Sequence, residues 1–186
     1  MEIQRHPTYH YNTEKIGNSI NNIKTINNFI SDSECNKIIQ STNLQKPRSK
    51  AGQWDGMEYT PDPAILPLVL DARNRALEAM LKAYGVPLTL VPNPHIVKWS
   101  KGQYMDEHSD DIGITKYNIS GVIYLNSEYS GGEINFKTSN ACYSMTIKPS
   151  TGDLVIFPGN SNYPHSVGEV LSGERYTIPV WASYKV

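Results

Sequence analysis

The chain has 186 residues, of which 39% are hydrophobic and 19% charged, and its formal net charge at pH 7 is −1. A chain of this length is expected to form one domain with a sizeable core. The near-neutral balance argues against a dense basic surface that would bind a nucleic-acid backbone, so no nucleic-acid partner is expected.

The sequence predicts neither a membrane span nor a secretion signal. No apolar run approaches the roughly 20 residues that cross a bilayer, and the first 17 residues lack an apolar stretch of signal-peptide length. The two cysteines, Cys35 and Cys142, form no CxxC pattern. This usage is typical of a reducing compartment and argues against a disulfide scaffold or a thiolate zinc site. We therefore expect a cytoplasmic protein.

The first half of the chain favours helices and irregular connections. Residues 23–29 are typical of a short strand, and Ser31 or Ser33 is a suitable N-cap for the helix that follows. Residues 46–63 are rich in Pro, Gly, Ser and charge, which predicts a loop or irregular hairpin, a candidate lid. Residues 64–84 carry apolar side chains near the 3.6-residue period and end at Gly85, which predicts a helix that braces the core.

After Pro94 the pattern changes to short strands separated by turns. Strands are predicted at residues 95–100, 119–126, 133–137, 144–147, 153–157 and 176–184. Short strands at fairly even spacing, with no helices between them, indicate a sandwich or jelly roll. The predicted fold is mainly β with supporting helices. Residues 1–186 are expected to form a single domain, with a helical support and substrate-loop region at 1–93 and a jelly-roll core at 94–186.

Three residues of the β half suggest a metal site. His108 and Asp110 are two residues apart, so on an extended chain both side chains project to one face. His165 follows the strand segment GDLVIFP. Two histidines and one carboxylate form the facial triad that holds iron(II) in non-haem oxygenases and leaves positions open for dioxygen and a co-substrate. The remaining histidines, His6, His10 and His95, are expected to be ordinary surface or core residues.

A basic residue, Arg175, lies ten residues after His165 at the start of the last predicted strand. A guanidinium there can hold the far end of a dicarboxylate bidentately while the near end chelates the metal. The triad together with Arg175 indicates an oxygenase site much more specifically than the HxD pair or a single histidine does.

Half of the chain, from residue 94 to 186, resembles the prolyl 4-hydroxylase branch of the 2-oxoglutarate/iron(II) oxygenase superfamily. The segments that carry the resemblance are VKWSKGQY (97–104), VIYLN (122–126), GGE (131–133), GDLVIF (152–157), PHSV (164–167) and GERY (173–176) through Trp181. More loosely, residues 47–54 and the helix after them resemble the family's mobile substrate loop and support helix.

The resemblance implies a double-stranded β-helix, a cupin-like jelly roll with helices packed on one sheet. It implies iron(II) held by His108, Asp110 and His165, with dioxygen and 2-oxoglutarate as co-substrates and ascorbate as a further candidate. Arg175 would bind the C5 carboxylate of 2-oxoglutarate. The side chains expected near this site are the Tyr124 hydroxyl on the same carboxylate, Tyr104 close by, Trp181 beside the distal histidine, and Arg48 and Trp54 on the substrate loop.

Within the family, Asp110 favours hydroxylation, because halogenating members lack the carboxylate. Trp181 occupies the place where nucleic-acid demethylating members carry a second arginine. The main hypothesis is therefore a prolyl 4-hydroxylase that acts on peptidyl proline and converts 2-oxoglutarate to succinate and carbon dioxide.

Three alternatives stay open. The first is a hydroxylase of a free amino acid or other small molecule, which a closed pocket rather than an open groove would favour. The second is a non-catalytic cupin-like metal-binding or carbohydrate-binding protein, which would not need Arg175. The third is a zinc hydrolase, in which Arg175 has no role. The sequence does not define an oligomeric state.

Overall fold

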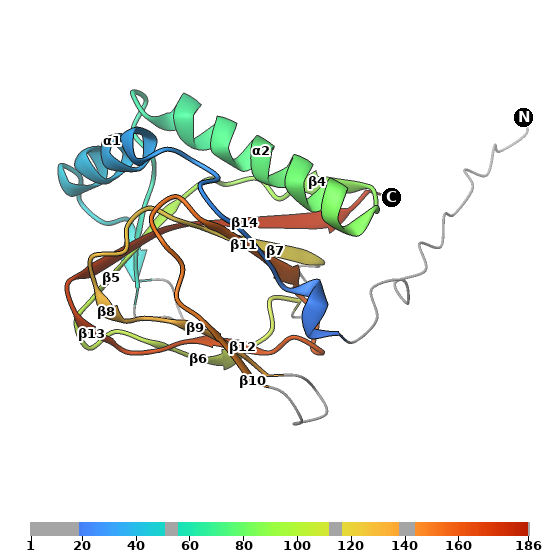
Figure 1. Ribbon diagram of the computed structural model, residues 1–186. Helices are drawn as coiled ribbons and strands as arrows, with labels where there is room; N and C mark the ends of the chain where they lie inside the picture. Colours follow the sequence, from blue (N-terminus) through green and yellow to red (C-terminus); the bar gives the residue numbers. More distant parts are fainter. Residues whose placement is uncertain (1–18, 51–55, 112–116, 138–143, 186) are drawn as a thin grey trace, which may run out of the picture.

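The computed structural model describes residues 19–50, 56–111, 117–137 and 144–185. Two β-sheets face each other, and helices α1 (Asp32–Asn43) and α2 (Leu66–Tyr84) lie on the outer side of the larger sheet (Figure 1). A short 3-10 helix, η2 (Ile20–Asn22), precedes the first strand. The mainly β fold with supporting helices is the predicted one.

The larger sheet has eight strands in the order β1-β11-β7-β14-β5-β3-β2, with β4 also pairing β14, and the smaller has the order β10-β9-β12-β6. Strands β13 and β8 form a separate pair. The strands are β1 (Lys24–Ile26), β2 (Ser49–Lys50), β3 (Met57–Tyr59), β4 (Leu88–Leu90), β5 (Ile96–Ser100), β6 (Met105–His108), β7 (Ile119–Tyr124), β8 (Ser130–Gly131), β9 (Ile134–Lys137), β10 (Ser144–Ile147), β11 (Leu154–Pro158), β12 (His165–Val167), β13 (Val170–Ser172) and β14 (Glu174–Tyr184).

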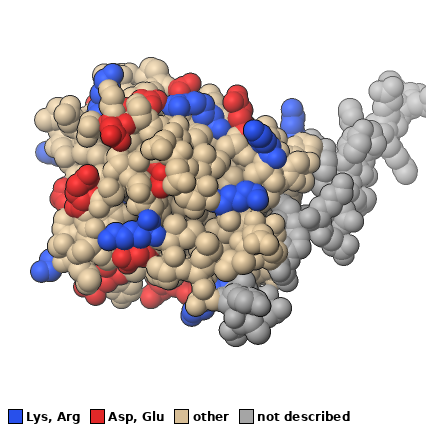
Figure 2. Space-filling model, in the orientation of Figure 1, with Lys and Arg blue, Asp and Glu red and all other residues tan. Residues whose placement is uncertain are grey.

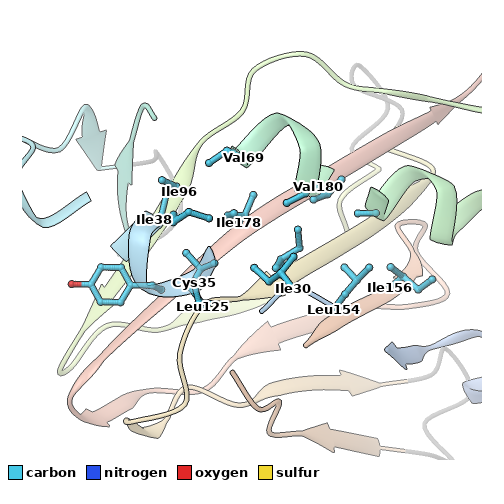
Figure 3. Packing of buried hydrophobic residues seen from close by; sticks show 14 of the residues in the cluster. Ile30, Cys35, Ile38, Val69, Ile96, Leu125, Leu154, Ile156, Ile178 and Val180 are labelled. Carbon is cyan, nitrogen blue, oxygen red and sulfur yellow. The ribbon is translucent and has the colours of Figure 1, made fainter. Parts of the chain in front are cut away.

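The larger core lies between the two helices and the outer face of the larger sheet. Figure 3 shows Cys35 and Ile38 of α1 and Val69 of α2 packed over Ile178 and Val180 of β14. A second core fills the space between the two sheets, where Phe136 of β9 and Phe157 of β11 meet edge to face. The helices therefore stabilise the sheet from outside and leave its inner face to line a cavity.

Helix α2 approaches the larger sheet closely because residue 121 is a glycine. A Cβ at Gly121 would lie 2.6 Å from the Cε atom of Met80, which is fully buried on α2. Pro67 stands in the first turn of α2, and Gly85 ends it with a φ of +64°. Both ends match the predicted helix to within two residues.

Ser31 is the N-cap of helix α1, which settles the choice between the two predicted caps. The Ser31 hydroxyl accepts the backbone N–H of Glu34 at 3.3 Å, and the Glu34 carboxylate accepts the backbone N–H of Ser31 at 2.7 Å. These two bonds form a capping box.

Replacing Ser31 by alanine is expected to lower the free energy of unfolding by about 1 kcal/mol, because the first turn of α1 loses its cap. Urea denaturation followed by circular dichroism measures the loss. Ser33→Ala, an exposed serine of the same helix, is the matched control and is expected to change stability much less. Equal losses in the two variants would contradict the role of Ser31.

Strand β14 accommodates a proline in the middle of the sheet. It pairs with β5 only through residues 174–177 and with β4 only through residues 182–184, so a gap separates those two partners. Trp181 accepts the Val91 N–H on the β4 side of the strand at 2.8 Å. The backbone of Pro179, two residues earlier, points to the same side of β14, into the gap between β5 and β4. Its missing N–H therefore costs no hydrogen bond between strands.

Some of the strands were not predicted. Segment 46–63, for which a loop or irregular hairpin was predicted without strand bounds, contains the antiparallel pair β2–β3, in which the Arg48 N–H donates to the Glu58 carbonyl at 2.7 Å. Strands β6 and β12 are absent from the prediction because Met-Asp-Glu-His and His-Ser-Val are too short to show alternation.

The surface shown in Figure 2 carries Lys and Arg interspersed with Asp and Glu among its coloured residues. Among the helices of the described residues, none is long and apolar enough to cross a membrane.

Candidate metal and co-substrate site

The structure brings His108, Asp110 and His165 together. His108 of β6 lies opposite His165 of β12, and their ring centroids are 4.3 Å apart. Asp110 follows β6, with Oδ1 at 3.6 Å from the His108 Nε2 atom and Oδ2 at 3.7 Å from the His165 Nε2 atom. The three ligand atoms lie within 4.8 Å of one another. Two imidazoles and a carboxylate at this spacing suit a single divalent ion.

A β-bulge in β6 directs His108 to this position. His108 pairs with His165 and Met105 with Val167, so three steps along β6 match two along β12. The bulge absorbs the extra residue, so Met105 and His108, three positions apart, still project to the same side, where both line one cavity. Tyr104, the neighbour of Met105, consequently points away and is 47% exposed. The expected position of Tyr104 at the site is therefore wrong, and Met105 takes its place.

Backbone carbonyls fix the tautomers of both histidines. The Nδ1 atom of His108 lies 2.9 Å from the Asp106 carbonyl, and that of His165 lies 3.2 Å from the Tyr163 carbonyl. A carbonyl only accepts, so Nδ1 carries the hydrogen in each ring. In the neutral form of each ring, the Nε2 lone pair then faces Asp110 and is available to a metal.

Burial and charge act in opposite directions on the triad. Burial would raise the pKa of Asp110, but the bonds and charges of His108 and His165, with a hydrogen bond from Ser120, bring it below its usual value. Burial lowers the pKa of His165. The site therefore favours a charged carboxylate and, at His165, a neutral imidazole, which are the metal-binding forms. At His108 burial lowers the pKa, but the bonds to Asp110 and Asp106 and the Asp110 charge outweigh it and raise the pKa, so a metal that binds there would displace a proton.

Ser120 of β7 positions the carboxylate. Its side chain is buried, and its hydroxyl donates to the Asp110 Oδ2 atom at 2.5 Å. The sequence did not single out Ser120, because its contact with Asp110 depends on how β7 lies beside the loop after β6.

Ser120→Ala is expected to weaken metal affinity by about 10- to 100-fold, since outer-shell partners of metal ligands typically contribute that much. Competition for iron(II) against a coloured chelator, under anaerobic conditions, measures the change. Ser166→Ala is the matched control, because Ser166 lies between the cavity-lining residues His165 and Val167 but does not itself line the cavity. Unchanged affinity in Ser120→Ala would rule out this role.

Arg175 of β14 lies in the same cavity as a buried cation. It is 2% exposed, and its Nη2 atom donates to the Tyr124 hydroxyl at 3.4 Å. The guanidinium lies over the rings of Trp99 and Tyr124, with centroid distances of 5.7 and 5.0 Å. Within the described residues no carboxylate forms an ion pair with Arg175, and its Nε atom has no hydrogen-bond partner. A buried cation in this state is suited to receive an anion.

Tyr129, which the sequence did not predict as a site residue, lies beside Arg175. It is 6% exposed, and its hydroxyl is buried without a partner among the described residues. Burial raises the pKa of Tyr129, while the nearby Arg175 opposes the rise. Gly132 leaves room for the pair, because a Cβ there would lie 3.0 Å from the Cδ atom of Arg175. The tyrosine directly before the Ser-Gly-Gly turn was the available signal.

The cavity between the sheets contains about 500 Å³ of space between atoms, solvent at its mouth included. Trp181 lines it, as predicted, and its ring stacks on Tyr117 with centroids 5.1 Å apart. Arg48 is exposed, and Trp54 lies outside the described residues. The cavity walls are largely apolar. The residues that line the cavity are Val97, Trp99, Met105, His108, Asp110, Ser120, Gly121, Val122, Ile134, Phe157, His165, Val167, Arg175, Thr177, Pro179 and Trp181.

Comparison with known proteins gives one family. Residues 94–183 match the family model described as the 2OG-Fe(II) oxygenase superfamily. A PKHD-type hydroxylase of Prochlorococcus marinus (strain MIT 9215) is 31% identical over 108 residues, which cover 56% of this chain and 47% of the relative. The chain thus spans about half the length of that relative. A putative prolyl 4-hydroxylase of Acanthamoeba polyphaga mimivirus is 24% identical over 188 residues, which cover 84% of this chain and 72% of the relative.

Among solved structures, a Pseudomonas putida prolyl-4-hydroxylase superposes with a TM-score of 0.71 at 16% identity, covering 89% of this chain and 94% of that one. This likeness in three dimensions confirms the predicted jelly-roll, or double-stranded β-helix, fold.

Proposed function

Because this chain belongs to the 2OG-Fe(II) oxygenase superfamily, we propose that it is an iron(II)- and 2-oxoglutarate-dependent hydroxylase. In this proposal His108, Asp110 and His165 are the metal ligands, and Arg175 anchors the co-substrate. The observation that carries it is the presence, in one cavity, of the triad and of a buried guanidinium without a counter-ion.

The residues fit the co-substrate as well as the metal. The Arg175 Nε atom and the Tyr129 hydroxyl are buried donors without partners in the described part of the chain. A carboxylate bound there would accept from both and would neutralise the guanidinium. Tyr124, whose hydroxyl already contacts Arg175, completes the predicted carboxylate site.

Iron(II) with 2-oxoglutarate and dioxygen supplies the oxidation, in which the co-substrate is converted to succinate and carbon dioxide. The chain's own residues bind and orient. Arg175 fixes the far end of the co-substrate relative to the triad, and Ser120 holds the Asp110 carboxylate in place. Phe157 and Val167, with the other apolar walls, keep bulk water from the reacting centre.

For the prime substrate we propose a peptidyl proline. The support is the similarity of this chain to a putative prolyl 4-hydroxylase of mimivirus and to the P. putida prolyl-4-hydroxylase. The cytoplasmic location expected from the sequence stays a prediction, as do the substrate-loop roles of Arg48 and Trp54.

An anaerobic titration tests the reaction class. Metal-free protein receives iron(II) and then 2-oxoglutarate, and the weak visible charge-transfer band of the chelate is expected to appear. Proline-rich peptides are then screened for a gain in mass of one oxygen atom. Iron binding without the band would overturn the oxygenase proposal in favour of a cupin-like binding protein. Turnover of only free amino acids or other small molecules would retain the reaction and replace the substrate.

A further inference from the structure

Two polar side chains, Glu58 and His95, lie beside the metal cavity on the inner face of the larger sheet. Glu58 pairs with Val97, and Val97 pairs with Thr177, so the three form one row across β3, β5 and β14. Directly opposed residues of antiparallel strands project to the same face. Val97 and Thr177 line the cavity, and Glu58 therefore extends their row beyond it.

The second side chain, His95, reaches the same rim through Trp181. Its ring centroid lies 5.3 Å from that of Trp181, which lines the cavity. Its Nε2 atom lies 3.9 Å from the Glu58 Oε1 atom. His95 was expected to be an ordinary surface or core residue, but the pair it forms with Glu58 is adjacent to the proposed active site.

Glu58 and His95 present two acceptors to each other with no donor between them. The His95 Nδ1 atom lies 3.2 Å from the Asn93 carbonyl, so Nδ1 carries the hydrogen and Nε2 of the neutral ring is an acceptor. Nε2 is buried and has no hydrogen-bond partner among the described residues. Burial is the main reason that the pKa of His95 lies below its usual value. Asn93 and Glu58 oppose the shift, and Arg73 and Arg48 add to it.

Neither nearby arginine satisfies the Glu58 carboxylate. The Arg73 guanidinium donates to the Val91 carbonyl at 2.6 Å. Arg48 contributes its backbone N–H to the Glu58 carbonyl, not its side chain to the carboxylate. In the described part of the chain, His95 is the one basic group within ion-pair distance of Glu58, whose side chain is only 17% exposed. A largely buried carboxylate next to a bare imidazole nitrogen is costly unless a ligand brings the donors.

We propose that Glu58 and His95 form a substrate subsite for a cationic nitrogen with at least two N–H donors, a primary ammonium or a guanidinium. One N–H would be donated to Glu58 and another to the His95 Nε2 atom. The inference rests on the proposed function, since it names a feature of the molecule that the oxygenase would oxidise. Two strand spacings place Glu58 about 10 Å from Thr177. In an extended peptide that distance corresponds to roughly three residues. With the target residue bound at the cavity wall that Thr177 forms, Lys or Arg would therefore stand about three residues from it.

A binding experiment that needs no turnover tests the subsite. The full chain, loaded with zinc(II) and 2-oxoglutarate and labelled with ¹³C in its histidine rings, is titrated with n-butylammonium at neutral pH. Saturable shifts of the His95 signals are expected, and n-butanol, with the same carbon chain but no charge, is expected to produce none. Glu58→Gln should weaken the binding by about tenfold or more, because a charge-assisted bond becomes a neutral one. Glu78→Gln, on the exposed side of α2, is the matched control.

Absence of a saturable shift, or equal binding by wild type and Glu58→Gln, would overturn the proposal. The proposal would also be overturned if the His95 signals of the free protein were those of a charged imidazolium at neutral pH. Glu58 and His95 would then form an ion pair with each other and would not need a ligand to supply the hydrogen-bond donors.

Turnover identifies the source of the cation. Proline peptides with Lys three residues from the proline are compared with peptides that carry norleucine there. We expect about tenfold higher kcat/KM for the Lys peptide in wild type and Glu78→Gln, and no preference in Glu58→Gln. Butylammonium binding without hydroxylation of any peptide would assign the subsite to a small-molecule amine. If no variant decarboxylates 2-oxoglutarate, the proposed function fails, while the butylammonium titration still decides the subsite.

Discussion

Replacing Asp110 by alanine is expected to abolish turnover and to weaken iron(II) binding by more than about 100-fold. That figure is the upper end of what outer-shell partners contribute, and a direct ligand contributes more. The carboxylate lies between the two imidazoles, with an oxygen 3.6 Å from one Nε2 atom and 3.7 Å from the other. Without it, two neutral nitrogens remain, and the charge that balances the metal is lost. His108→Ala is expected to behave in the same way.

Metal content after anaerobic loading and 2-oxoglutarate consumption are the two measurements for Asp110→Ala. Asp106→Asn is a matched control, because the Asp106 side chain is exposed and only its backbone carbonyl contacts His108. The control should keep both properties. Full metal content and activity in Asp110→Ala would exclude the triad as the metal site.

Replacing Arg175 by alanine should raise the Kd for 2-oxoglutarate steeply and leave metal affinity nearly unchanged. Truncating one partner of a buried, hydrogen-bonded charge pair costs about 2–5 kcal/mol, which is roughly 30-fold to more than 1,000-fold in affinity. Titration of the charge-transfer band of the iron–2-oxoglutarate complex gives the affinity for 2-oxoglutarate. A metal competition assay gives the affinity for iron(II).

Arg175→Lys separates charge from geometry. A lysine keeps the cation but loses the planar pair of donors, so an intermediate Kd is expected. Equal 2-oxoglutarate affinity in wild type and Arg175→Ala would refute the assignment of Arg175. A parallel loss of metal affinity would instead indicate that the substitution disrupts the cavity.

The parts of the site that the sequence predicted are those with distinctive chemistry and spacing. His108, Asp110, His165 and Arg175 were selected by residue type, and the structure places all four around one cavity. Helix α2 was predicted because its apolar period extends over five turns and ends at Gly85.

What escaped prediction depends on pairing between distant strands. The choice of Met105 over Tyr104 follows from a bulge that exists only because β6 pairs with β12. Ser120 and Tyr129 matter through their contacts with Asp110 and Arg175, and neither has a recognisable motif of its own. Glu58 gains its interest from lying in one row with Val97 and Thr177.

The bulge in β6 makes the length of this short strand as important as its composition. A further residue inserted between Met105 and His108, if no second bulge absorbed it, would turn His108 away from Asp110, since a one-residue slip reverses every side chain of a strand. The side chains of Asp106 and Glu107 are exposed, so a change of identity at these positions, which at Glu107 would remove an ion pair with Lys137, is less disruptive than an inserted residue. Among descendants of this gene, substitutions should accumulate at these two positions while insertions are eliminated by selection.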